Sequence, residues 1–396
     1  MSELAASAGA DIVKRVWQSR AAPQAATLIG EGKVAEIGAA VSGDGADTVI
    51  FDHELTPTQQ RNLEKALGCK VVDRTQLILD IFASRARSRE GRLQVELAQL
   101  NYLLPRLAGH GVEMSRLGAG IGTRGPGETQ LETDRRRIAR RIKKIEQELA
   151  GVRAGRALHR RRRSAVPLAT LALTGYTNAG KSTLFNRLTQ AEVLVDARMF
   201  ATLDPTVRPL TLPSRRRVLV SDTVGFIRNL PTTVVKAFRA TLEEVQEAVL
   251  VLHIVDVSSP SASEHAAHVL KVLAEIGAAE IPQLLVCNKI DRLAESSSGF
   301  EALGRRLLGS GGNHQHARVV GVSGLTGAGI GDLLQAIDDC LPADPLIRAT
   351  LHLAAGDGAT LALLHEFGRV LETRYEGDVC IVQAEIPQSL ERRLHR

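Results

Sequence analysis

The chain has 396 residues, of which 44% are hydrophobic and 24% charged, and its formal net charge is +6. This length predicts two or three domains, and the composition is that of soluble globular proteins, which excludes disordered, collagen-like and low-complexity chains. Aromatic residues make up only 3% of the chain, which disfavours RNA binding by base stacking on aromatic platforms.

The cysteine spacing and the apolar segments exclude further classes. The four cysteines are far apart and form no CxxC pair, so neither a zinc site nor a disulfide framework is expected. The first residues lack the apolar core of a signal peptide, and no apolar run approaches the ~20 residues that span a bilayer. We therefore expect a cytoplasmic protein.

One segment carries most of the positive charge. Residues 134–163 contain thirteen Lys or Arg and three acids, a net charge of +10, so the rest of this +6 chain sums to −4. Such a concentration is typical of a surface that binds a polyanion through its phosphates. A solvated helix face is the alternative interpretation and an anionic membrane surface a third. Because three acids cannot balance thirteen bases, we favour nucleic acid.

Residues 1–90 predict a small α/β subdomain. Two short β-like runs, at 46–51 and 69–72, alternate with helical stretches at 58–67 and 75–89. Asp73 or Thr75 is expected to cap the second helical stretch, because both side chains accept hydrogen bonds from free backbone amides.

Residues 91–165 predict an antiparallel helical hairpin. Leucines 93, 97, 100, 104 and 107 follow heptad spacing, and Pro105 is expected to kink or end their helix. A second heptad seam runs from Leu131 to Val152, so each helix can bury the apolar stripe of the other.

The sequence GAGIGTRGPG, residues 118–127, lies between the two seams. It lacks the strand and spacing of a dinucleotide fingerprint. It is either a flexible connector or a side-chain-poor tip that approaches RNA phosphates closely, and the basic helix beside it favours the tip. The expected RNA contacts are Arg124, Gly125, Gly127, Arg135, Arg136 and Arg137.

Residues 166–341 predict an α/β domain with a mostly parallel sheet and helices on both faces. Five apolar runs suit buried parallel strands, and helical stretches separate most of them: 168–173, 217–221, 249–255, 283–287 and 318–322. Residues 342–347 are expected to be a linker, and residues 349–396 a small C-terminal α/β unit.

A phosphate-binding loop follows the first of these strands. GYTNAGKS, residues 175–182, fits G-x-x-x-x-G-K-[ST] between a strand and a helix, the context that the motif requires. Backbone amides at the helix start cradle phosphates. Lys181 is expected to bridge the β- and γ-phosphates, and the Ser182 hydroxyl to bind Mg²⁺.

Three further motifs follow in order, each at a strand end. DTVG (222–225) supplies a carboxylate, Asp222, that holds the metal through water, and the Gly225 amide senses the γ-phosphate. In NKID (288–291) the Asp291 carboxylate accepts from guanine N1–H and the exocyclic amine, which selects GTP over ATP. SGL (323–325) is expected to meet the guanine oxygen.

The stretch FATLDPT (200–206) is expected to supply a threonine that closes over Mg²⁺ and the γ-phosphate. Thr202 is the first choice and Thr206 the alternative. The catalytic set is then Lys181, Thr202 and Gly225. The full nucleotide site comprises Gly175, Tyr176, Thr177, Asn178, Ala179, Gly180, Lys181, Ser182, Thr183, Phe200, Ala201, Thr202, Leu203, Asp204, Asp222, Thr223, Val224, Gly225, Asn288, Lys289, Ile290, Asp291, Ser323, Gly324 and Leu325.

These motifs resemble the HflX GTPases of the Obg–HflX group of translation-related GTPases. The resemblance extends upstream through RNLE (61–64), DRTQLILDIFASRA (73–86), QVELAQL (94–100) and GTRGPGETQLETDRR (122–136). It implies Mg²⁺-dependent GTP hydrolysis, and as partner the ribosome, chiefly the large subunit and its RNA, with splitting or rescue of stalled ribosomes as the task. Gly324 departs from the usual alanine.

Phe226 occupies the position where many signalling GTPases place a water-orienting glutamine. We expect it to pack in the core, with slow intrinsic hydrolysis. The loop asparagine Asn178 is similar to that of GTPases whose site admits K⁺ as a substitute positive charge. His265 and His268 share a predicted helix face without a ligand cluster, so we interpret them as a surface pair.

The sequence thus predicts a GTP hydrolase that binds the ribosome and is a monomer away from it. Two alternatives remain open. One is a regulatory GTP/GDP switch whose N-terminal region binds a protein or membrane target, although no spanning segment supports membrane association. The other is an ATP-using RNA-remodelling enzyme, which NKID disfavours.

Overall fold

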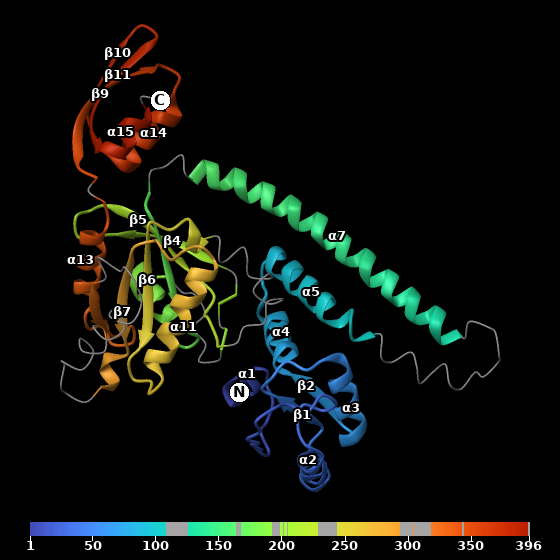
Figure 1. Cartoon of the computed structure of the whole chain (residues 1–396). Coiled ribbons are helices and arrows are strands. Elements are labelled where there is room, and N and C mark those ends of the chain that lie inside the picture. The colour runs from blue at the N-terminus through green and yellow to red at the C-terminus, as the bar shows by residue number, and fades with distance from the viewer. Residues whose placement is uncertain are drawn as a thin grey trace.

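The computed structural model describes residues 1–107, 126–163, 168–191, 199–200, 202–203, 205–228, 244–293, 304, 318–342 and 344–394. It has an N-terminal α/β unit, a long basic helix, a central sheet domain and a C-terminal antiparallel sheet (Figure 1). No helix within these ranges is long and apolar enough to cross a membrane.

The N-terminal unit contains a two-stranded parallel sheet, in which Val49 pairs with Val71. Its helices begin where the sequence supplies caps: the Asp73 side chain accepts from the Gln76 amide at 2.8 Å, as expected. The predicted helix 75–89 is shorter in the structure, since α4 ends at Arg85 and Ser88 caps a new helix that begins at Arg89. The elements are α1 (Ser2–Ser7), α2 (Glu31–Asp44), β1 (Thr48–Phe51), α3 (Pro57–Leu67), β2 (Lys70–Asp73), α4 (Arg74–Arg85) and α5 (Arg89–Leu103).

The two heptad seams meet as expected. Helix α5 ends at Leu103, two residues before Pro105, and packs on α7 (Pro126–Arg163). Leu93 of α5 and Ile145 and Leu149 of α7 form a small buried cluster. Helix α7 extends well beyond α5, so much of its length is free of this partner (Figure 1).

The expected glycine-rich tip is only partly visible. Residues 108–125, which include Arg124 and Gly125, lie outside the described part of the chain. The prediction that the tip reaches residue 127 is wrong. Proline fits the first turn of a helix because it has no amide to leave unpaired, and α7 accordingly begins at Pro126, so Gly127 is helical.

The central domain has a six-stranded sheet in the order β4-β5-β3-β6-β7-β8. Five strands are parallel and match the predicted runs, while β4 is an antiparallel edge strand that the sequence analysis missed. The elements are β3 (Thr170–Gly175), α8 (Lys181–Thr189), β4 (Thr206–Thr211), β5 (Arg217–Asp222), β6 (Leu250–Asp256), α11 (Ala262–Glu275), β7 (Gln283–Asn288), β8 (Val319–Val322) and α13 (Ile330–Cys340).

Helices cover both faces of this sheet. Successive residues of a strand point to opposite faces: Leu171 and Leu173 of β3 pack with α8 and α13, while Ala172 packs with α11. Because β3, β5, β6 and β7 are parallel, their carboxyl ends lie along one edge of the sheet. This is the edge at which an open α/β sheet binds its ligand.

A separate buried cluster joins the N-terminal unit to the central domain. Phe82 and other residues of α4 and α5 pack against Phe200, Leu203, Val224 and Ile227, which lie in or directly after the nucleotide motifs. The Phe82 and Phe200 rings meet edge to face, with centroids 4.6 Å apart. The segments after β5 and before β4 are thus held by the N-terminal helices.

The C-terminal unit is a three-stranded antiparallel sheet in the order β10-β11-β9, whose buried residues pack with two helices. The expected linker 342–347 is shorter than predicted, because Leu346 already pairs with Pro387 in the sheet. The elements are β9 (Leu346–Ala354), α14 (Gly358–Phe367), β10 (Arg369–Glu376), β11 (Val379–Pro387) and α15 (Gln388–Leu394).

Candidate nucleotide-binding site

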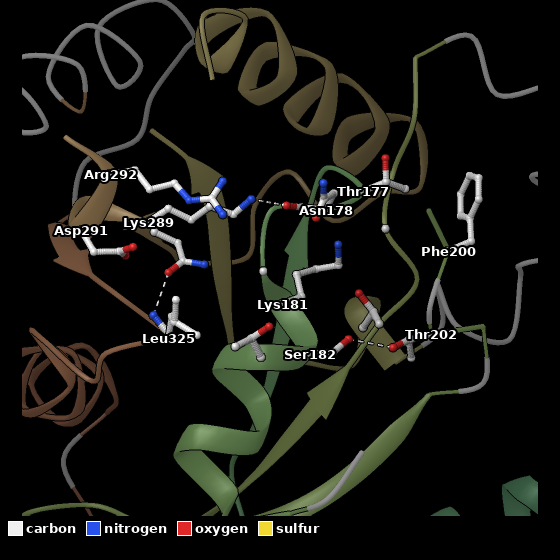
Figure 2. A pocket seen from close by; sticks show the side chains of 16 residues that line it. Thr177, Asn178, Lys181, Ser182, Phe200, Thr202, Lys289, Asp291, Arg292 and Leu325 are labelled. Atoms are coloured by element: carbon white, nitrogen blue, oxygen red, sulfur yellow. Dashed lines mark hydrogen bonds between the residues drawn. The ribbon is translucent and has the colours of Figure 1, made fainter. Parts of the chain in front are cut away.

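A cavity of about 360 Å³ opens at the carboxyl edge of the central sheet (Figure 2). This is within the size range of small-ligand sites. It is lined by all four nucleotide motifs and by Phe200 and Thr202. The motifs that the sequence spreads over 151 positions therefore converge on one site.

Two glycines allow the phosphate loop its tight course. A Cβ at Gly175 would lie 2.3 Å from the carbonyl oxygen of Ile254, and one at Gly180 would lie 2.2 Å from Asn288 Nδ2. Gly180 also has a positive φ of 92°, which side chains disfavour. The loop thereby passes directly into α8, whose first residues, Lys181, Ser182 and Thr183, line the cavity, and helix starts of this kind bind anions.

Lys181 is buried at the start of α8. Its Nζ donates to the carbonyl oxygens of Gly175 at 3.2 Å and Tyr176 at 2.8 Å. Burial lowers the pKa of Lys181 to about 8, while the Asp222 carboxylate opposes that shift. Neutral carbonyl oxygens thus hold the Lys181 ammonium group, and Asp222 is the acid that favours its charge among the described residues, an environment that suits an incoming phosphate.

The side-chain oxygens of Ser182, Thr202 and Asp222 meet near Lys181, and Figure 2 shows the first two of these side chains. Ser182 Oγ and Thr202 Oγ1 lie 2.8 Å apart and donate to Asp222 Oδ2 at 2.8 and 2.9 Å. Asp222 is fully buried, and burial raises its pKa, against the lowering effects of Lys181 and the two hydroxyls. Its other oxygen, Oδ1, has no hydrogen-bond partner among the described residues.

These residues fit a magnesium ion. Mg²⁺ prefers hard oxygen ligands and is usually bound through one or two carboxylates, waters and phosphates. A buried carboxylate with one unpartnered oxygen and two adjacent hydroxyls supplies that chemistry. Of the two candidate threonines, Thr202 contacts Ser182 and Asp222. Thr206 begins β4, where its backbone pairs opposite Asp222.

The segment that carries Thr202 is anchored by Phe200. This residue has a φ of 59°, which costs a bulky side chain roughly 1–2 kcal/mol. Its side chain is 2% exposed in the cluster with Phe82, and such burial contributes about 1.5–3 kcal/mol, enough to offset that cost. Ala201 and Asp204 lie outside the described residues.

The guanine-side motif joins the loops to one another. Asn288 Nδ2 donates to the Ala179 carbonyl at 2.8 Å, and Asn288 Oδ1 accepts from the Gly324 amide at 3.0 Å. Lys289 Nζ donates to the Asn178 carbonyl at 2.8 Å and pairs with Asp256 at 2.7 Å.

Asp291, in the short helix η2 (Ile290–Arg292), lines the same end of the cavity as Leu325. Asp256 and Arg292 belong to this region and were missed. An acid at the carboxyl end of a buried strand was the available signal for Asp256.

Several predicted residues lie close to the cavity without lining it. Leu203 and Val224 pack into the cluster with the N-terminal helices, and Ile290 packs beside α11. The buried Ser323 accepts from the Thr326 amide at 3.1 Å and shapes its own turn. Thr183 and Thr223, by contrast, line the cavity as predicted.

Gly225 and Phe226 follow Asp222 at the cavity wall. A Cβ at Gly225 would lie 2.8 Å from Lys181 Nζ and 2.9 Å from Thr177 Cα, so only glycine lets the two segments approach this closely. Phe226 is 4% exposed and packs with Val245 and Val251. The expectation that it packs in the core is confirmed.

The interpretation of His265 and His268 as a plain surface pair is wrong. The His265 ring stacks on Tyr176 of the phosphate loop, with centroids 3.8 Å apart, and His268 Nε2 lies 2.9 Å from the Ile227 carbonyl oxygen. Helix periodicity placed both on one face, but only the fold brings that face to the loop.

The basic side chains of α7 between residues 135 and 144 are exposed. Arg136 pairs with Glu132 at 2.6 Å, and Arg141 pairs with Glu96 of α5 at 2.6 Å. Arg135 and Arg137 are exposed and have no ion-pair partner within the part of the chain that the structure describes.

Comparisons with known proteins agree with this geometry. Family models match residues 1–83 as "GTP-binding GTPase N-terminal", 85–163 as "GTP-binding GTPase Middle Region" and 170–289 as "50S ribosome-binding GTPase". Together with the phosphate loop and the DTVG and NKID motifs, they define a P-loop GTPase.

Curated relatives narrow the class. The GTPase HflX of Caldanaerobacter subterraneus is 47% identical over 100% of this chain and 88% of its own length. That of Escherichia coli K12 is 44% identical over 97% of this chain and 88% of its own. The chain belongs to the HflX family of GTPases, and it is a GTP hydrolase. A Sulfolobus solfataricus GTP-binding protein in complex with GDP has a TM-score of 0.46 and 24% identity over 86% of this chain and 93% of its own.

Thr202→Ala is expected to weaken GTP binding about 5- to 20-fold, because its hydroxyl is expected to contact the metal when the γ-phosphate is present. GDP lacks that phosphate, so GDP binding should stay within twofold of wild type. Titration of fluorescent GTP and GDP analogues in Mg²⁺ measures both affinities. Thr206→Ala is the matched control and is expected to behave as wild type. The assignment is wrong if Thr206→Ala shows the selective loss and Thr202→Ala does not.

Proposed function

We propose that this GTPase binds the large ribosomal subunit through α7 and couples GTP binding and hydrolysis to ribosome dissociation or to the rescue of stalled ribosomes. The observation that carries the proposal is the exposed basic face of α7, where Arg135 and Arg137 lack acidic partners in the described structure. Unpaired cations on a rigid helix favour binding to RNA phosphates through counterion release. The description "50S ribosome-binding GTPase" of the matching family model supports the choice of partner.

In this proposal each motif has one task. Lys181 neutralises the β- and γ-phosphates, and Ser182 and Thr202 bind Mg²⁺, with Asp222 acting through water. The Gly225 amide faces the γ-phosphate. Bound Mg²⁺ supplies positive charge to the phosphates. Water attacks the γ-phosphorus, the bond to the β-phosphate oxygen breaks, and GDP and inorganic phosphate leave.

Base selection in this proposal belongs to Asp291. Its carboxylate accepts from the two adjacent guanine donors, and adenine offers no such pair. Asn288 and Lys289 support this by fixing the phosphate loop and the Gly324 loop, as their hydrogen bonds indicate. Cytoplasmic location and a monomeric state away from the ribosome belong to the same proposal.

K⁺ is a proposed second cofactor, with Asn178 as its protein ligand. Asn178 is exposed in the phosphate loop and lines the cavity. Phe226, at the position of a water-orienting glutamine, is buried and cannot act on the attacking water. A monovalent cation can supply the missing positive charge near the transferred phosphate.

Replacing K⁺ by Na⁺ at constant ionic strength is therefore expected to slow GTP hydrolysis about 3- to 10-fold, because Na⁺ is too small for the same oxygen ligands. Phosphate release measured with and without ribosomes tests this. Asn178→Ala is expected to abolish the difference between the salts. Equal hydrolysis rates of the wild type in K⁺ and Na⁺ would show that K⁺ is not a cofactor of this reaction.

The ribosome proposal is tested by two matched double variants. Arg135→Ala with Arg137→Ala removes two cations without acidic partners, while Arg136→Ala with Arg141→Ala removes two that are already ion-paired. Co-sedimentation with ribosomes is measured across salt concentrations. For the first variant we expect weaker binding and a salt slope lowered by roughly 0.7–0.9 per lost phosphate contact. For the second we expect smaller changes in both.

Both variants should keep wild-type affinity for GTP away from the ribosome. Ribosome splitting, followed on the same sucrose gradients, should fall with binding in the first variant. If the first variant binds and splits ribosomes normally at physiological salt, α7 is a solvated face. A regulatory switch with another target then becomes the better account.

A further inference from the structure

Tyr176 connects the phosphate loop to two other elements. Its ring stacks on His265 of α11, with the planes 8° apart and the centroids at 3.8 Å. Its hydroxyl accepts from the backbone amide of Arg228 at 3.1 Å. The backbone carbonyl of Tyr176 also accepts from Lys181 Nζ. One side chain of the phosphate loop is therefore tied to α11 and to the segment that follows Gly225.

His268 holds the same segment directly. It lies three residues after His265 on α11, and its Nε2 donates to the carbonyl oxygen of Ile227 at 2.9 Å. Burial lowers the pKa of His265, partly offset by Glu264. Its ring is therefore the neutral imidazole that stacks on Tyr176 at neutral pH. Helix α11 therefore contacts Ile227 directly through His268. It reaches Arg228 indirectly, because His265 stacks on Tyr176, whose hydroxyl accepts from the Arg228 amide.

Further contacts complete the hold on this segment. The Phe226 amide donates to the Gly175 carbonyl at 3.0 Å, and the Phe226 carbonyl accepts from the Thr177 amide at 2.8 Å. From the N-terminal unit, Arg74 donates to the Arg228 carbonyl at 2.6 Å and pairs with Asp52. Residues 226, 227 and 228 each have backbone atoms fixed from outside the segment.

The structure that has these contacts to residues 226–228 also has the proposed Mg²⁺ ligands close together, as binding of a triphosphate would require. Ser182, Thr202 and Asp222 are within hydrogen-bond distance of one another in the same structure. An amide that is already placed contributes more to transition-state stabilisation than one that must be ordered during the reaction. The fixed segment begins at Gly225.

We propose that His265 and His268 are positioning residues for GTP hydrolysis, which hold residues 226–228 against the phosphate loop, through Tyr176 and directly, so that the Gly225 amide is preset for the γ-phosphate. The proposal rests on the proposed role of Gly225. Neither histidine touches the nucleotide cavity, so their effect is on the reaction rate and on GTP binding. GDP, which lacks the γ-phosphate, binds independently of them.

The test uses the full chain and single-turnover GTP hydrolysis. His265→Ala is expected to lower the hydrolysis rate about 3- to 10-fold, because stacked aromatic pairs contribute roughly 0.5–1.5 kcal/mol beyond their buried area. His265→Phe keeps the stack and is expected to stay within twofold of wild type. His268→Ala is expected to lose rate similarly, and His268→Gln, whose amide can donate to the same carbonyl, to regain it.

GDP affinity and melting temperature separate positioning from a general loss of structure. Both are expected to stay at the wild-type level in His265→Phe and His268→Gln, and GDP affinity to change less than twofold in the alanine variants. Tyr176→Phe keeps the stack but loses the bond from the Arg228 amide, so an intermediate rate is expected. Lys271→Ala, on the exposed side of α11, is the matched control and should match wild type.

Gly225→Ala distinguishes the two ways in which the account can fail. Its Cβ would collide with Thr177 and Lys181, so hydrolysis should be lost if Gly225 has the proposed role. If Gly225→Ala is inactive and both histidine-to-alanine variants hydrolyse GTP at the wild-type rate, the positioning proposal is overturned. If Gly225→Ala is as active as wild type, the role of Gly225 itself fails.

Discussion

Two opposite charges buried at one sheet edge, Lys181 and Asp222, are the constraint around which this structure is organised. Burial works against both charges, lowering the pKa of the lysine and raising that of the aspartate. Lys181 donates hydrogen bonds to two carbonyl oxygens, and two hydroxyls donate to Asp222. The other carboxylate oxygen of Asp222 has no hydrogen-bond partner in the described structure. Phosphate and Mg²⁺ would supply the missing charges, so this polar site is best satisfied when occupied.

The surroundings explain how this site is connected to the rest of the molecule. Phe200 and Ile227, which lie on either side of Thr202 and Asp222 in sequence, are buried in the cluster with the N-terminal helices. The same N-terminal unit continues through α5 into contact with α7. A contact chain therefore runs from the nucleotide motifs to the basic helix that we propose for ribosomal RNA.

The sequence alone predicts the parts of this site that follow local rules. Buried strands, the phosphate loop and the strand-end motifs have strong spacing signals, and the parallel sheet brings them together at one edge. The edge strand β4 was missed because it has one buried residue, Leu210, and contains Pro209. The roles of His265 and Phe200 could not be read from periodicity. Both depend on contacts with residues far away in sequence, Tyr176 and Phe82.

We propose that buried Asp222, with Ser182 and Thr202, holds a magnesium ion that balances the charge of a GTP bound at Lys181. The affinity of the wild-type chain for a non-hydrolysable GTP analogue, measured in Mg²⁺ and again in excess chelator, tests this directly. We expect binding at least about 10-fold tighter with Mg²⁺, because the metal would link the buried carboxylate, through water, to the phosphates. Equal affinity with and without Mg²⁺ would contradict it.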